Sequence, residues 1–187
     1  MKPILLTFVL LTSMITVFAQ DAMTPERFRS VVAAPGDNTP LISQLASVPF
    51  WTNAVVSNTM TYTSGKVLTE QMTLSAHTVG GKYVVFTMDS QVYHGPVNTI
   101  LTLDEKSSSL KVYGLFPDEE GKDVLTESTV TYNFKKKTFS MNSTYLDFKE
   151  SVSGSYSDTQ STVKATAYKD GVLVMTRETI TRPVGGK

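Results

Sequence analysis

The stretch VLTEQMTLSAHTVGGKYVVFTMDSQVY, residues 67–93, decides the fold class of this chain. Apolar and polar residues alternate on both sides of a TVGG linker, which is the period of a half-buried β-strand. Gly80 and Gly81 accept the positive φ angles of a tight turn. The residues expected on the apolar faces of the two strands are Leu68, Met72, Leu74, Val84, Phe86, Met88 and Val92. The stretch therefore predicts two long antiparallel strands joined by a hairpin.

The same alternation recurs from Ala54 to the end of the chain, in segments separated by turn residues. The last two segments, STVKATAY and VLVMTRETIT, are joined by KDG, and Asp170-Gly171 is a strong hairpin signal. The lysine run 135–137 is expected at a solvated hairpin tip. We expect about nine to ten strands in nearest-neighbour order. A sandwich would have shorter strands and longer crossovers, so the pattern favours an all-β, antiparallel up-and-down β-barrel, whose closure removes unpaired edges.

The N-terminal residues 1–19 have the features of a secretory signal peptide. Lys2 supplies a positive start, an apolar run follows it, and Val17 and Ala19 are small residues at the positions expected before a cleavage site. The alternative is a membrane anchor, but the apolar run is shorter than the ~20 residues that span a bilayer. We therefore expect cleavage after Ala19, no integral membrane segment in the mature chain, and a secreted or periplasmic location.

Two helical signals precede the strands. Thr24, Pro25 and Glu26 form a helix start, and Thr39 and Pro40 repeat the arrangement. The breaker-rich AAPGDN lies between them. These signals divide the mature chain into an N-terminal arm, residues 20–38, and a barrel domain with a short helical lead, residues 39–187. The alternative is that the residues before about Thr39 form a tail.

Composition excludes several functional classes. The chain has no cysteine, which removes disulfides, thiol catalysis and thiolate metal sites. With 17 basic and 17 acidic residues it has no strong basic field to recruit nucleic acid or anionic membrane. Its two histidines are expected on different faces, so no zinc site is predicted. The sequence predicts no metal and no cofactor, and it leaves the oligomeric state open.

The order of features resembles a lipocalin-like (calycin-type) family of exported proteins classed as a domain of unknown function. The segments that carry the resemblance are LISQLASVPFW, GGKYVVFTMDS, HGPVNTILTLDEKSSSLKVYGLF and the closing hairpin, between about Leu41 and Arg182. The resemblance implies a barrel with an internal cavity. It implies no catalytic residues, and none is predicted.

His94 is the first candidate site residue. Continuing the alternation of residues 84–92 puts it on the apolar face at a strand end, where it would reach into the barrel mouth as a ligand contact or a general base. The alternative is a structural role, because HGPV also reads as a turn with Gly95 and Pro96.

Two glutamates are expected among the inward-facing residues. Glu70 lies between Leu68 and Met72, and Glu178 shares the phase of Val174 and Ile180. A carboxylate inside a barrel is costly unless it is paired or hydrated, so both are candidate polar anchors for a ligand. The alternative is that a bulge shifts the phase and sends a glutamate to solvent. The full set of predicted ligand contacts is Glu70, Met72, Phe86, Met88, His94, Tyr132 and Glu178.

Two classes of function follow from these residues, and a third option is an envelope or matrix interaction protein in which the cavity has no role. The first is a binding protein that holds a small apolar or amphipathic ligand in the barrel. The second is an enzyme of isomerase, cyclase or hydratase type, in which a buried glutamate works with a histidine or tyrosine in proton transfer. The sequence favours the first class, because a proton-transfer site needs partners that the pattern alone does not bring together.

Overall fold

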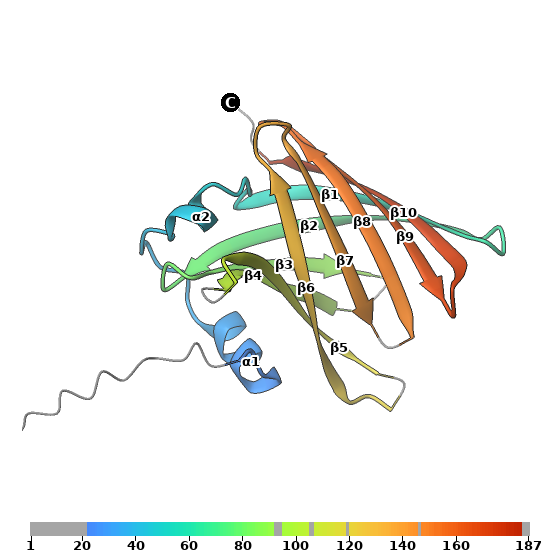
Figure 1. Ribbon diagram of the computed structural model, residues 1–187, viewed down its shortest axis with the longest axis horizontal. Coiled ribbons are helices and arrows are strands. Elements are labelled where there is room, and N and C mark those ends of the chain that lie inside the picture. The colour runs from blue at the N-terminus through green and yellow to red at the C-terminus, as the bar shows by residue number, and fades with distance from the viewer. Residues whose placement is uncertain (1–21, 92–94, 105–106, 119, 146, 185–187) are drawn as a thin grey trace, which may run out of the picture.

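The computed structural model describes residues 22–91, 95–104, 107–118, 120–145 and 147–184. Ten strands form a closed antiparallel barrel in the order in which they follow along the chain, and β1 pairs with β10 to close it (Figure 1). The predicted up-and-down barrel is thereby confirmed. The elements are α1 (Pro25–Ala33), α2 (Ser43–Ala46), β1 (Asn53–Tyr62), β2 (Val67–Val79), β3 (Tyr83–Ser90), β4 (Gly95–Asp104), β5 (Ser109–Pro117), β6 (Asp123–Asn133), β7 (Thr138–Tyr145), β8 (Phe148–Tyr156), β9 (Ser161–Lys169) and β10 (Val172–Pro183).

The predicted turns lie at the predicted places. Gly80 and Gly81 adopt φ angles of 57° and 66° between β2 and β3, and Asp170 and Gly171 adopt 51° and 78° between β9 and β10. Consecutive positive φ angles match the right-handed twist of the flanking strands. The lysine run 135–137 is exposed between β6 and β7, as expected of a hairpin tip. Short turns of this kind keep each strand beside its sequence neighbour.

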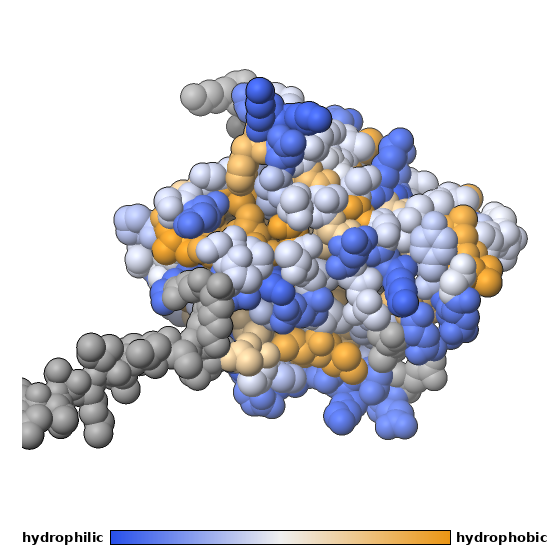
Figure 2. All heavy atoms as spheres, in the orientation of Figure 1, coloured by the Kyte–Doolittle hydropathy of each residue, from blue (hydrophilic) through white to orange (hydrophobic). Residues whose placement is uncertain are grey.

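The outer face of the barrel is mostly polar, and one part of it is covered by the N-terminal arm. Phe28 and Val31 of α1 pack against Val85 and Ile100, which point outward from β3 and β4. Thr24 caps this helix, since its hydroxyl accepts a hydrogen bond from the Arg27 amide at 3.2 Å. Elsewhere polar side chains cover most of the face shown in Figure 2, with hydrophobic residues in separate patches.

A second segment ties the arm to the β2–β3 hairpin. The Asp37 carboxylate accepts hydrogen bonds from the Gly80 amide at 2.7 Å and the Thr39 amide at 2.9 Å. These two bonds, led by the one from Gly80, hold the pKa of Asp37 below its usual value. The Ile42 amide then donates to Gly81 O at 3.0 Å. These contacts hold residues 37–42, here called the strap, in an extended path. The second helix therefore begins at Ser43 and not at Pro40, where the sequence signal predicted its start.

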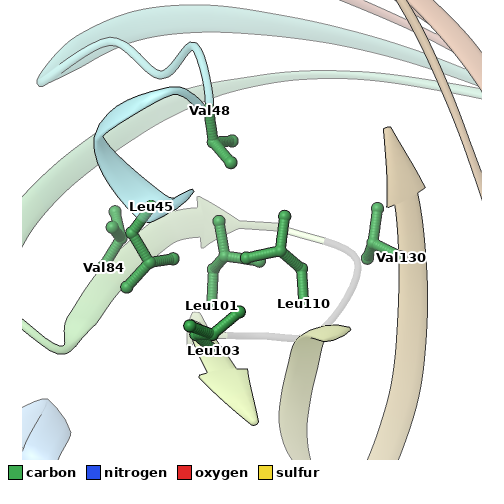
Figure 3. Close-up of a cluster of buried hydrophobic side chains, with 7 residues drawn as sticks. All are labelled: Leu45, Val48, Val84, Leu101, Leu103, Leu110 and Val130. Atoms are coloured by element: carbon green, nitrogen blue, oxygen red, sulfur yellow. The ribbon is translucent and has the colours of Figure 1, made fainter. Parts of the chain in front are cut away.

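Helix α2 fills one end of the barrel. Leu45 is fully buried and Val48 nearly so, and both pack against inward-facing residues of the strands (Figure 3). Burying a side chain of this size contributes about 1.5–3 kcal/mol. The strand residues of this cluster are Val84, Leu101, Leu103, Leu110 and Val130. Apolar side chains therefore fill much of the barrel at the α2 end, and the β1–β2 hairpin extends at the opposite end (Figure 1).

Candidate ligand-binding cavity

The other half of the barrel encloses a cavity of about 360 Å³, to which all ten strands contribute. This volume is at the small end of the range for ligand pockets. Its apolar lining is Val56, Met72, Met88, Val97, Val112, Phe116, Phe139, Met141, Val152 and Val163. Its polar lining is Asn58, Glu70, Ser90, Thr99, Thr126, Ser128, Ser143, Glu150, Arg177 and Thr179. An apolar wall with a few polar groups is typical of sites for small molecules.

Two glycines on the inner face explain why this half is hollow. A Cβ atom built on Gly114 would lie 2.5 Å from the ring of Phe116, and one built on Gly154 would lie 2.4 Å from the ring of Phe139. Each ring therefore lies against the strand that carries the glycine, and any other residue there would push the ring away from the wall. Glycine inside a strand often marks such a close approach.

Glu70 is the most deeply buried acidic group of the lining. It comes from the first half of β2, is 9% exposed, and its Oε1 accepts a hydrogen bond of 2.7 Å from Ser90 Oγ at the end of β3. On the neighbouring strand β1, Asn58 lies opposite Glu70, and its Oδ1 accepts a 3.0 Å bond from Thr179 Oγ1 of β10. Polar side chains thus run across four adjacent strands inside an otherwise apolar barrel.

An ion pair continues this polar region. Arg177 Nη2 of β10 donates to Glu150 Oε1 of β8 at 2.8 Å, and the two side chains are 29% and 20% exposed. Arg177 Nε is buried and has no hydrogen-bond partner among the described residues. Buried donors normally have a hydrogen-bond partner. Arg177 Nε is an exception, because the described residues provide no acceptor for it.

The structure brings three of the predicted contacts together. Glu70, Met72 and Met88 all line the cavity. Phe86 and Tyr132 also face the barrel interior, but they pack around the α2 end, where they line a separate pocket of about 160 Å³. There Phe86 makes an edge contact with Phe50 at 6.2 Å between ring centroids, and burial, with a smaller effect of Tyr156, raises the pKa of Tyr132 to about 12. His94 lies outside the described residues.

The inward orientation expected for Glu178 is wrong. Glu178 is exposed on the outer face, and its neighbour Arg177 lines the cavity. The register of β10 against β9 shifts between Leu173, opposite Tyr168, and Met175, opposite Ala167. This bulge inverts the alternation for the rest of β10, as an inserted residue does.

Arg177 and Glu150 were missed as site residues, for different reasons. No pattern in VLVMTRETIT marks the bulge that turns Arg177 inward. Glu150 did carry a signal, because it shares the phase of Phe148 and Val152 in FKESVSGSY, which predicts an inward carboxylate.

The second histidine lies outside the cavity. His77 points outward from β2 and is covered by the N-terminal segment. A Cβ atom built on Gly36 of that segment would lie 3.0 Å from the Cβ atom of His77. Its Nε2 is buried without a hydrogen-bond partner in the part of the chain that the structure describes. Within that same part, no three histidine, aspartate or glutamate side chains gather as a metal site requires.

Comparisons with family models and with curated sequences identify no relative. No protein-family model matches the chain, and no curated protein sequence matches it at a significant level. Among the described residues, no helix is both long enough and apolar enough to cross a membrane.

Proposed function

We propose that this protein is an exported carrier that holds one small, largely apolar molecule inside its barrel. The observation that carries the proposal is the cavity of about 360 Å³ in a barrel whose other half holds a buried hydrophobic cluster. A chain that needed only a stable core would gain by filling this space, since cavities cost stability. The inward glycines and short polar side chains keep it hollow instead.

Three further features support the proposal. The signal-peptide pattern of residues 1–19 favours export. Three methionines in the wall, Met72, Met88 and Met141, suit a flexible apolar ligand, because methionine side chains adapt their shape. The order of sequence features resembles that of lipocalin-like proteins, and a closed barrel is in keeping with this resemblance. We therefore also propose that the chain belongs to the lipocalin-like proteins.

Native mass spectrometry of the protein purified from its own host tests this function. We expect a polypeptide that begins at Gln20, with one small molecule bound per chain and released on denaturation. The measurement reports export and binding separately, since the polypeptide mass gives the cleavage site. A preparation that carries no small molecule, and that also fails to bind an uncharged fluorescent naphthylamine, would contradict the carrier function.

A further inference from the structure

We infer that the cavity selects uncharged amphipathic molecules with a hydrogen-bond acceptor, such as a ketone or an alcohol on an alkyl chain, over the corresponding carboxylates. The inference rests on the proposed carrier function and narrows its ligand class. It follows from the charges of the lining, the state of Arg177 and the shape of the apolar wall.

The charges of the cavity lining disfavour an anionic ligand. Among the described lining residues two are acidic, Glu70 and Glu150, and one is basic, Arg177. The single guanidinium is already held by Glu150 at 2.8 Å. Beside these described residues a ligand carboxylate would be a third carboxylate next to one cation, and it would lose its hydration on entry. An uncharged ligand avoids both costs.

Arg177 also provides a reason for an acceptor on the ligand. Guanidinium has five N–H donors, and the ion pair with Glu150 uses Nη2. Nε has no acceptor among the described residues, and 29% of the side chain remains exposed. A carbonyl or hydroxyl oxygen of a ligand at this edge would satisfy donors that the protein leaves unused, and bonds to charged donors are stronger than neutral ones.

The remaining wall suits an alkyl chain. Met72, Met88 and Met141 line the cavity together with the rings of Phe116 and Phe139, which lie close to Gly114 and Gly154 of the wall. Flexible thioethers next to flat rings fit a chain without a rigid shape of its own. A volume of about 360 Å³ favours a short molecule, so ten-carbon compounds are the appropriate probes.

The test is competition against uncharged N-phenyl-1-naphthylamine, with 2-decanone and decanoate as competitors of matched chain length at neutral pH. We expect 2-decanone to bind at least about tenfold more tightly than decanoate, the size of one charge-assisted hydrogen bond or one unfavourable charge. In Glu70→Gln the affinity for decanoate should rise relative to that for 2-decanone, since one carboxylate of the lining is gone.

The role of Arg177 is tested by a pair of variants. Arg177→Met combined with Glu150→Gln removes the ion pair without leaving a buried charge unpaired, and it should weaken 2-decanone binding about tenfold. Arg182→Met is the matched control, because Arg182 lies exposed on the outer face of the same strand. Its affinity for 2-decanone should equal that of the wild type.

The outcomes separate the two proposals. Decanoate binding as tightly as 2-decanone, or an unchanged affinity for 2-decanone in the double variant, would overturn the inference and leave the carrier function standing. Failure of the dye and of both competitors to bind would overturn the carrier function and this inference with it.

Discussion

Replacing Leu45 with alanine should lower the free energy of unfolding by about 2–5 kcal/mol. Leu45 is fully buried, and α2 inserts it among Val84, Leu101 and Leu110 at the closed end of the barrel. Removing its isobutyl group loses the burial of the side chain and leaves a gap that the surrounding strands fill only in part. Urea denaturation followed by tryptophan fluorescence measures the effect, and Trp51 is the single tryptophan of the chain.

Leu173→Ala is the matched control for this variant. Leu173 is 37% exposed near the β9–β10 turn, so its truncation should change the unfolding free energy far less, by roughly 0.5 kcal/mol. If Leu45→Ala were no more destabilising than Leu173→Ala, α2 would not be part of the cooperative core, and the barrel would lack the closed end described here.

Filling the cavity should abolish ligand binding. In Ser128→Phe a phenyl ring replaces a hydroxymethyl group on the inner face of β6, where Ser128 is 7% exposed and lines the cavity. Because the ring occupies the space that a ligand needs, we expect the affinity for uncharged N-phenyl-1-naphthylamine to fall on the order of 100-fold. Fluorescence titration gives the Kd, and a thermal melt verifies that the variant is folded, since overpacking costs about 1–3 kcal/mol.

The adjacent substitution Thr129→Phe is the control for cavity filling. Thr129 is exposed on the outer face of the same strand, so it adds the same ring without entering the barrel. Its dye affinity should match that of the wild type. Equal affinities for Ser128→Phe and the wild type would mean that the dye binds elsewhere, for example in a surface depression.

The sequence was sufficient to predict the barrel because its signals are local and repeated. Alternation defined the strands, and the hairpin residues Gly80-Gly81 and Asp170-Gly171 joined neighbours in the only order that short turns allow. The same alternation correctly turned Glu70, Met72 and Met88 inward. These residues lie in β2 and β3, and the pairings of β2 with β1 and with β3 have no register shift.

The rest of the cavity depended on features that alternation does not contain. The bulge near Met175 adds one residue to β10 and so exchanges the faces of Arg177 and Glu178. The hollow itself depends on the close contacts of the Phe116 ring with Gly114 and of the Phe139 ring with Gly154. Side-chain contacts of this kind cannot be read from the alternation of apolar and polar residues. The N-terminal arm was expected only as a segment before the barrel, and its contact with the outer face of β3 and β4 involves residues distant in sequence.

The most direct test of the account is the site at which a small molecule binds. NMR of protein labelled with ¹³C at the methionine methyl groups reports this as 2-decanone is added. Met72, Met88 and Met141 line the cavity, whereas Met23 packs on the outside with α1. We predict saturable shifts of the three cavity methyl signals while the Met23 signal stays in place. Saturation that moves Met23 and leaves the cavity methionines unchanged would contradict the claim that this barrel carries its ligand inside.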